Sequence, residues 1–361
     1  MKDLSHLFHP DFKSLQPYSP IEPPSQIAKR LGLSEDEIIK LDANENPFGL
    51  HPRLQQVLSK QKYLHIYPDP AQVELRAAIS DYAGVTPEQI VAGAGADEII
   101  DLAMRLFLEK GDQVLSFGPT FSYYDHVAAL NHAEFILEPR EEDFSIDIEK
   151  VKKLDLTRVK LVFLCSPNNP SGNQVEEAVV DYLLRHDLIV LVDEAYGEFS
   201  GVSLVEKLKT HSNLVILKTF SKCFALAGLR VGYGITSKAI ASQLMKIKPP
   251  YGVNVAAEVL LKEALANMDI FKGQVAEIIA TRDWFFAEVS KLDGIQAYES
   301  QANYILLRIL EKDALTIKNQ LEQEGILVRY FNREPLTGCI RVTIGLKEQM
   351  EKLLVSLKAK L

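Results

Sequence analysis

Between about residues 41 and 248, apolar segments of strand length alternate with longer segments of helical periodicity. Such alternation is typical of a largely parallel sheet with helices on both faces, because parallel strands need a crossover connection. We therefore predict an α/β fold with a mostly parallel, seven-stranded sheet between helices. The expected strands are Gln89–Ala92, Gln113–Phe117, Glu134–Leu137, Lys160–Cys165, Leu188–Val192, Leu214–Lys218 and Arg230–Ile235.

The two ends of the chain do not share this pattern. Residues 1–30 are rich in proline and aromatic residues and weakly periodic, which favours an extended arm. Pro249 and Pro250 interrupt a helical run, and because proline ends or bends helices they mark a domain boundary. Long helical patterns and short strands near 303–307 and 339–343 follow. We predict an N-terminal arm (1–30), a large domain (31–248) and a smaller α+β domain (249–361).

A lysine lies just after one of the predicted strands. The segment Lys218-Thr-Phe-Ser-Lys222 continues an apolar strand, and Arg230 lies eight residues beyond Lys222. Ligands of open α/β sheets bind at the carboxyl ends of the strands. A lysine amine among apolar neighbours or near a cation loses its proton more easily and can then form a Schiff base with an aldehyde. Ser221 and Arg230 could hold a phosphate nearby, the first by a hydrogen bond and the second by a bidentate charge pair.

An acidic residue ends a second predicted strand. Leu188–Val192 runs into Asp193-Glu-Ala-Tyr196, so the carboxylate is expected at the same sheet edge as Lys222. A carboxylate paired with a pyridine nitrogen keeps that nitrogen protonated, which makes the ring an electron sink. Asp193 could instead serve only as a helix N-cap, a position that Asp favours. Its occurrence together with Lys222 favours the functional interpretation.

Two loops complete the predicted site. Ser166-Pro-Asn-Asn-Pro-Ser-Gly172 is a turn by composition, in which Asn169 could donate its side-chain amide to a phenolate oxygen shared with Tyr196. Gly93–Asp97 precedes a predicted helix, Glu98–Leu108, whose free N–H groups could bind a phosphate. A dinucleotide fingerprint is disfavoured, because Glu98 stands where the third glycine belongs and the next strand ends in Gly-Pro rather than an acid.

Composition and charge narrow the classes of function. The net charge of −9 disfavours a nucleic-acid partner. The longest apolar runs are far shorter than the roughly 20 residues of a membrane-spanning helix, and the first fifteen residues contain acids and histidines rather than a signal-peptide core. We predict a cytoplasmic protein without a membrane partner. The three cysteines lack a paired spacing and are expected to be reduced core thiols, and no His/Cys spacing predicts a metal site.

Further short motifs accompany these segments along nearly the whole chain. They are Pro17-Tyr18, Leu41-Asp-Ala-Asn-Glu-Asn-Pro47, Tyr67-Pro-Asp69, Pro119-Thr-Phe121, Gly228-Leu-Arg230 and Gly338-Cys-Ile-Arg-Val-Thr-Ile-Gly345. Each motif alone is weak, but the ordered set is specific. In this order they resemble the fold-type-I pyridoxal-phosphate-dependent aminotransferases, and within that group the histidinol-phosphate aminotransferase family.

The resemblance implies roles for individual residues toward pyridoxal 5′-phosphate. Lys222 would form the Schiff base with the cofactor and shuttle the proton, and Asp193 would pair with the pyridine nitrogen. Phe121 would stack on the ring where the family often has Tyr, and loss of the hydroxyl leaves stacking possible. The other implied cofactor ligands are Asn169 and Tyr196 at the ring oxygen, and Gly95, Ala96, Asp97, Thr219, Ser221 and Arg230 around the phosphate.

The resemblance also implies substrate ligands and a homodimer with shared active sites. Tyr67 would reach the phosphate of the neighbouring subunit. Arg341 would receive the amino donor's α-carboxylate, although an outward polar residue is also expected in its alternating strand. Arg329 and Tyr18 would hold the substrate phosphate, with Arg308 and Arg333 as nearby alternatives to Arg329. Asn44 is the remaining substrate-binding candidate.

The implied reaction is transamination of L-histidinol phosphate with 2-oxoglutarate to imidazole-acetol phosphate and L-glutamate, which serves histidine biosynthesis in the reverse direction. Two alternatives use the same lysine, aspartate and phosphate cup: an aromatic-amino-acid aminotransferase and a threonine-phosphate decarboxylase. A cofactor-binding regulatory protein without turnover is an alternative of another class.

Overall fold

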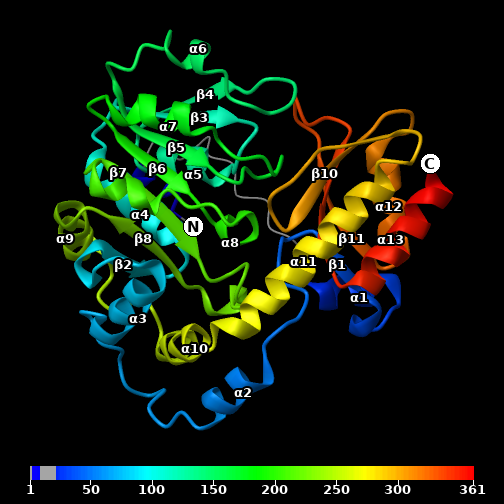
Figure 1. Ribbon diagram of the computed structural model, residues 1–361, viewed down its shortest axis with the longest axis horizontal. Helices are drawn as coiled ribbons and strands as arrows, with labels where there is room; N and C mark the ends of the chain where they lie inside the picture. The colour runs from blue at the N-terminus through cyan, green and yellow to red at the C-terminus, as the bar shows by residue number, and fades with distance from the viewer. Residues whose placement is uncertain (1, 9–21) are drawn as a thin grey trace.

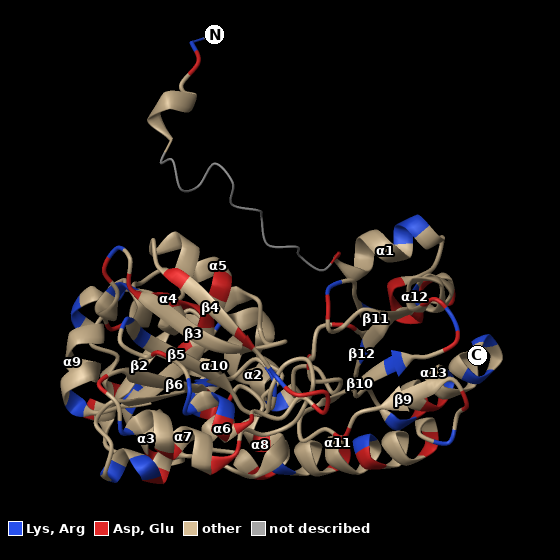
Figure 2. Cartoon of the chain, turned by 90° about the horizontal axis from the view of Figure 1, so that it is seen from above, with Lys and Arg blue, Asp and Glu red and all other residues tan. Residues whose placement is uncertain are grey.

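Two bodies of unequal size lie side by side in the computed structural model, which describes residues 2–8 and 22–361. The 22-residue helix α11 (Met268–Val289) runs along both bodies (Figure 1). It contacts α8 (Gly197–Ser200) in the larger body and β10 (Tyr304–Ile309) and α13 (Lys347–Lys360) in the smaller one. In the view from above, this helix carries both acidic and basic residues along its length (Figure 2).

The larger body contains a seven-stranded sheet with the strand order β2-β8-β7-β6-β5-β3-β4. Every neighbouring pair is parallel except the two that involve β8, so the mostly parallel sheet is confirmed. Its strands are β2 (Ile90–Gly93), β3 (Gln113–Gly118), β4 (Glu134–Pro139), β5 (Val159–Cys165), β6 (Ile189–Asp193), β7 (Leu214–Thr219) and β8 (Gly232–Thr236). The predicted last strand began two residues too early, because Arg230 has a left-handed backbone (φ 55°).

Helices cover both faces of this sheet because its central strands are apolar on both sides. Val215 and Leu217 of β7 pack in one core cluster with α4 (Ala96–Phe107), α5 (Tyr123–Leu130) and α9 (Lys238–Ile247). Leu214 and Ile216 pack in the opposite cluster with α3 (Val73–Ala83), α7 (Glu177–Leu184) and α10 (Val255–Leu265). Consecutive residues of a strand point to opposite faces, so the uninterrupted apolar segment fits a sheet buried on both sides.

The smaller body is built on a five-stranded sheet with the order β1-β11-β12-β10-β9. Its strands are β1 (Ile39–Leu41), β9 (Ile295–Ala297), β10, β11 (Ile326–Phe331) and β12 (Cys339–Thr343). The edge strand β1 pairs in parallel with β11, although its residues precede the whole larger body in sequence. The remaining α-helices of the described residues are α1 (Pro24–Leu31), α2 (Pro52–Ser59), α6 (Ile148–Val151) and α12 (Ala314–Gln323).

The division into residues 1–30, 31–248 and 249–361 stays a prediction, and two contacts bear on its boundaries. Strand β1, assigned by sequence to the large domain, belongs to the smaller sheet. Helix α10, which follows Pro249 and Pro250, packs against α2 and α3 rather than against the smaller sheet. No helix within residues 2–8 and 22–361 is long and apolar enough to cross a membrane. All three cysteines are buried and unpaired.

Candidate active site

The carboxyl ends of three neighbouring parallel strands bring the predicted residues together. Asp193 is the last residue of β6, Asn169 lies in the loop after β5, and Lys222 follows the end of β7 by three residues. These strands are adjacent in the order β7-β6-β5. Since the ends of parallel strands meet at one edge, residues far apart in the sequence converge there.

Lys222 presents a reactive amine in this cluster. Its Nζ donates a hydrogen bond to the carbonyl oxygen of Ala43 at 3.0 Å and lies 5.8 Å from the centre of the Tyr196 ring. Burial, together with the positive charge of Arg341, lowers the pKa of Lys222 to about 8. About a tenth of the amine is therefore unprotonated at pH 7, far more than for an exposed lysine, as a nucleophile or a base requires.

Asp193 is buried, with 4% of its surface exposed, and both of its oxygens have partners. Tyr124 donates its hydroxyl to Oδ2 at 2.6 Å, and the backbone N–H of Ala195 donates to Oδ1 at 3.0 Å. Burial raises the pKa of Asp193 to about 6, while these two hydrogen bonds lower it. The carboxylate is thus mostly ionised at neutral pH, which suits a partner for a protonated ring nitrogen.

A hydrogen-bond network joins the two bodies around Tyr196. Asn44 donates its Nδ2 to the Tyr196 hydroxyl at 3.0 Å, and its backbone N–H donates to the Thr343 hydroxyl at 2.9 Å. Asn44 is buried and has a left-handed backbone (φ 54°). Its side chain therefore supports Tyr196, whether or not it also binds substrate as predicted.

Arg341 reaches the same network from β12. Its Nη1 donates to the side-chain oxygen of Asn169 at 2.6 Å and its Nη2 donates to the carbonyl oxygen of Asp42 at 2.7 Å. The Nε atom is buried and has no hydrogen-bond partner among the residues that the structure describes. The Asn169 amide is oriented with its Nδ2 outside this contact, and the Nε–H of the Arg341 guanidinium is left without a partner.

The predicted phosphate cup is built around the start of α4. Gly95 precedes this helix with φ 88°, and a Cβ atom there would lie 2.5 Å from Nη2 of Arg230. Arg230 also pairs with the Asp97 carboxylate at 2.8 Å. The hydroxyls of Thr219 and Ser221 are joined at 3.0 Å. Backbone N–H groups, two hydroxyls and a guanidinium are the donors that a phosphate needs.

Three predicted residues are placed less centrally, and a fourth is not described. Phe121 contacts the edge of the Tyr124 ring at 5.5 Å between ring centres. Arg329 lies on β11 directly opposite Arg341 of β12. Tyr67 is 77% exposed and stacks on Tyr251 instead of joining the cluster. Tyr18 lies outside the residues that the structure describes.

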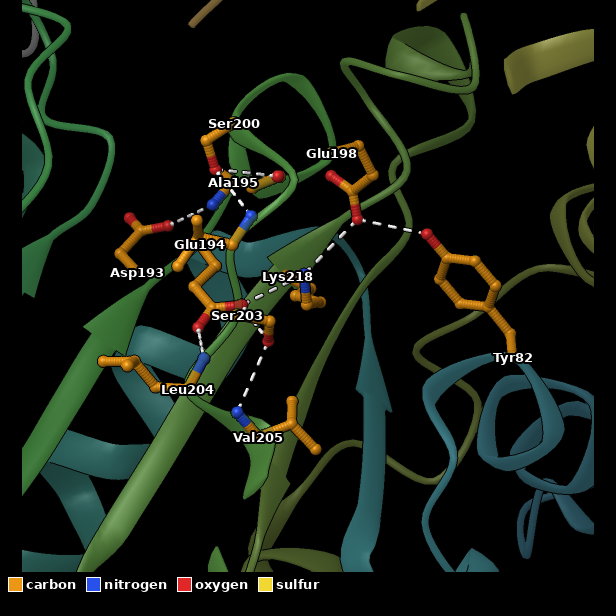
Figure 3. A network of polar contacts seen from close by, with 12 residues as sticks. Tyr82, Asp193, Glu194, Ala195, Glu198, Ser200, Ser203, Leu204, Val205 and Lys218 are labelled. Atoms are coloured by element: carbon orange, nitrogen blue, oxygen red, sulfur yellow. Dashed lines mark hydrogen bonds and ion pairs between the residues drawn. The ribbon is translucent and has the colours of Figure 1, made fainter. Parts of the chain in front are cut away.

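A buried charge cluster lies directly behind the site and was not predicted (Figure 3). Lys218 of β7 pairs with Glu194 at 3.1 Å and with Glu198 at 3.4 Å. Tyr82 donates its hydroxyl to Glu198 at 3.2 Å, and the backbone N–H of Leu204 donates to Glu194 at 2.7 Å. The cluster ties the end of β7 to the residue that follows Asp193, so it fixes the ends of two strands that carry the site.

Replacing Lys218 with methionine should lower the free energy of unfolding by about 3 kcal/mol, because it leaves two carboxylates buried without their cation. Urea denaturation of the protein without added cofactor would measure this loss. Lys209→Met is the matched control, since the Lys209 side chain is 73% exposed and pairs only with the exposed Glu206. Equal stability of the two variants would show that Lys218 is not a structural cation.

Comparison with known proteins agrees with this geometry. The aminotransferase class I and II family matches residues 36–357. A histidinol-phosphate aminotransferase of Roseiflexus castenholzii is 44% identical over 98% of both chains. The chloroplastic histidinol-phosphate aminotransferase of Nicotiana tabacum is 41% identical over 97% of this chain and 85% of its own.

A solved structure extends the likeness to three dimensions. The histidinol-phosphate aminotransferase of Sinorhizobium meliloti, in complex with pyridoxal-5′-phosphate, superposes with a TM-score of 0.86. It is 26% identical, and the match covers 98% of this chain and 96% of that one. The chain belongs to the aminotransferase class I and II family and, within it, to the histidinol-phosphate aminotransferases.

Proposed function

We propose that the protein transfers an amino group between L-histidinol phosphate and 2-oxoglutarate, forming imidazole-acetol phosphate and L-glutamate. The reverse direction supplies histidine biosynthesis. One observation carries the proposal: the Lys222 amine and the Asp193 carboxylate lie at the same edge of the large sheet, and Arg341 of the smaller sheet lies close enough to lower the pKa of Lys222 and to bond Asn169. The relatives at 44% and 41% identity carry the name of this activity.

We propose pyridoxal 5′-phosphate as the cofactor, because the donor set fits each part of that molecule. An amine of lowered pKa at Lys222 suits its aldehyde, and the carboxylate of Asp193 suits its ring nitrogen. Gly95 leaves no room for a side chain beside Arg230, as expected where backbone approaches a phosphate. When bound, the cofactor supplies an electron-withdrawing ring that stabilises negative charge on the substrate's α-carbon.

Residues of the chain itself would transfer the proton and hold the cofactor ring. The Lys222 Nζ accepts the proton of the substrate's α-carbon and returns it to the product, for which a pKa near 8 is well matched. Asp193 holds a proton on the ring nitrogen by its negative charge. The Asn169 Nδ2 and the Tyr196 hydroxyl would hold the ring oxygen, and Arg341 fixes the orientation of Asn169.

The two arginines of the smaller sheet fit the anionic groups of both proposed substrates. Arg329 and Arg341 face each other across β11 and β12 and therefore lie on the same side of the sheet. Like charges directly opposite are unfavourable unless an anion lies between them. The α-carboxylate of glutamate would supply this negative charge in one half-reaction, and the phosphate of histidinol phosphate would supply it in the other.

Single-turnover absorbance spectra test the substrate assignment. The protein loaded with pyridoxal phosphate would be mixed separately with histidinol phosphate, phenylalanine, tyrosine and threonine phosphate. Fast conversion of the cofactor to its amine form with histidinol phosphate alone supports the proposal. A comparable rate with the aromatic amino acids would indicate an aromatic-amino-acid aminotransferase. Release of carbon dioxide from threonine phosphate would indicate a threonine-phosphate decarboxylase. A bound cofactor that responds to none of them would indicate a regulatory protein.

We further propose a homodimer that forms through an exposed apolar patch, defined by Tyr63, Leu64, Ile66, Tyr67 and Tyr251. All five side chains are exposed, and the last four line one shallow hollow. Contiguous apolar patches of this kind mark protein interfaces. Tyr67 belongs to this patch, which suits a side chain that serves the partner's site.

Ile66→Glu should weaken the dimer at least about 100-fold, because a carboxylate would be buried against apolar surface. Sedimentation equilibrium over a range of protein concentrations measures the dissociation constant. Val355→Glu on α13 is the control, since Val355 is even more exposed but lies outside the patch. If both variants dimerise like the unchanged protein, the interface lies elsewhere. We also propose that the protein is cytoplasmic, which cell fractionation would test.

A further inference from the structure

One buried hydroxyl beside the site has no role in the function described so far. Tyr124 lies in the first turn of α5, is fully buried, and donates its hydroxyl to Oδ2 of Asp193 at 2.6 Å. The other carboxylate oxygen accepts from the backbone N–H of Ala195. A hydrogen bond to an ionised carboxylate is charge-assisted, and such bonds are shorter and stronger than neutral ones.

Packing leaves the Tyr124 ring little freedom. It stacks on Phe163 of β5 with ring centres 4.7 Å apart and planes at 21°. It also meets the edge of Phe121, with centres 5.5 Å apart and planes at 89°. Phe121 is the residue proposed to stack on the cofactor. The position of the Tyr124 ring therefore affects both the Asp193 carboxylate and the Phe121 ring.

The surroundings of Asp193 contain other groups that titrate or carry charge. They are the Cys165 thiol of β5, the carboxylates of Asp97 and Glu194, and the hydroxyls of Tyr196 and Tyr304. Burial and the two neighbouring carboxylates favour the protonated form of Asp193, and the strongest opposing contribution is the hydrogen bond from Tyr124.

We propose that Tyr124 is a positioning residue whose hydroxyl orients Asp193 and keeps it in the charged form that a cofactor's ring nitrogen requires. This inference rests on the proposed function, since it assigns Tyr124 a task toward the proposed cofactor. Tyr124 does not itself touch the reacting atoms. It acts only through Asp193.

Tyr124→Phe removes the hydroxyl and keeps the packed ring. The affinity of the cofactor-free protein for pyridoxal phosphate, titrated by absorbance between pH 5 and 8.5, gives a readout that does not depend on turnover. Loss of the hydrogen bond raises the pKa of Asp193, and a protonated carboxyl cannot pair with a protonated ring nitrogen. Affinity is lost as pH falls through that pKa, so the midpoint should move upward by about one pH unit. At pH 6.5 the ionised fraction of Asp193 would then fall about threefold, so the variant should bind about threefold more weakly, and the difference should approach tenfold at pH 5.

Tyr82→Phe is the matched control, because Tyr82 also donates its hydroxyl to a carboxylate, Glu198, but not to Asp193. Its midpoint should stay at that of the unchanged protein. Combining Tyr124→Phe with Asp193→Asn should add no further loss, since the asparagine background has already removed the charge that Tyr124 stabilises.

Three outcomes separate the possibilities. An upward shift confined to Tyr124→Phe supports the positioning role. An unchanged affinity and midpoint in a folded Tyr124→Phe variant overturns it. If the unchanged protein itself fails to bind pyridoxal phosphate, the proposed function fails first, and the two failures are distinguishable.

Discussion

Replacing Lys222 with alanine should reduce the rate of transamination on the order of 10³-fold or more, because it removes both the nucleophile and the base. Lys218 cannot replace this amine, because it is paired with Glu194 and Glu198, and these two carboxylates raise the pKa of Lys218. Lys222 itself makes one hydrogen bond, to a carbonyl oxygen, so its loss should leave the fold intact.

Two measurements check this expectation. Steady-state rates with glutamate and imidazole-acetol phosphate give the loss of activity. Borohydride reduction followed by mass spectrometry shows whether the cofactor is attached to the peptide that contains residue 222. Lys246→Ala serves as the control, because Lys246 is an exposed lysine of α9 outside the site. A Lys222→Ala protein that turns over at the normal rate would make the central assignment wrong.

Arg341→Met should lower kcat/KM for glutamate about 100-fold or more, since truncating one partner of a buried charge pair costs roughly 2–5 kcal/mol. Only 7% of the Arg341 surface is exposed, and its Nε is buried without a hydrogen-bond partner among the described residues. The loss should be smaller for histidinol phosphate, which has no α-carboxylate. Both substrates lose some rate, because Arg341 also orients Asn169.

The comparison between substrates makes this prediction specific. Rates are measured for each half-reaction alone, so that glutamate and histidinol phosphate are assayed independently. Arg105→Met on α4 is the control, since its side chain is 62% exposed and pairs only with Asp101. Equal losses for both substrates would mean that Arg341 acts through Asn169 and not as the carboxylate ligand.

The large sheet could be predicted from the sequence because each of its strands is a local apolar segment that can be recognised without knowing its partner strand. Apolar segments such as Leu161–Cys165 are buried on both faces, and each is followed by a polar loop. Strands β1 and β11 were not predicted. Strand β1 has only three residues, and its partner strand, which begins at Ile326, is remote in sequence, so no local pattern reveals their pairing.

The site shows the same contrast. Lys222, Asp193 and Asn169 follow strand ends, where position in sequence implies position in space. Tyr124 reaches Asp193 across 69 residues, and nothing around it in the sequence indicates that contact. Lys218 could have been recognised, because a lysine that ends the buried run Leu214–Leu217 needs a buried acid. Its acid, Glu194, directly follows Asp193 at the end of the adjacent strand.

The pairing of β1 with β11 governs the order in which a growing chain can fold. A ribosome releases Ile39–Leu41 early, whereas its partner emerges only near the end of synthesis. All seven strands of the large sheet lie between these two events and can associate first. During that interval β1 is an unpaired apolar strand, and closing so long a loop is slow. A chain that stalls before β11 would therefore hold a complete large sheet beside an exposed strand, the kind of species that chaperones bind.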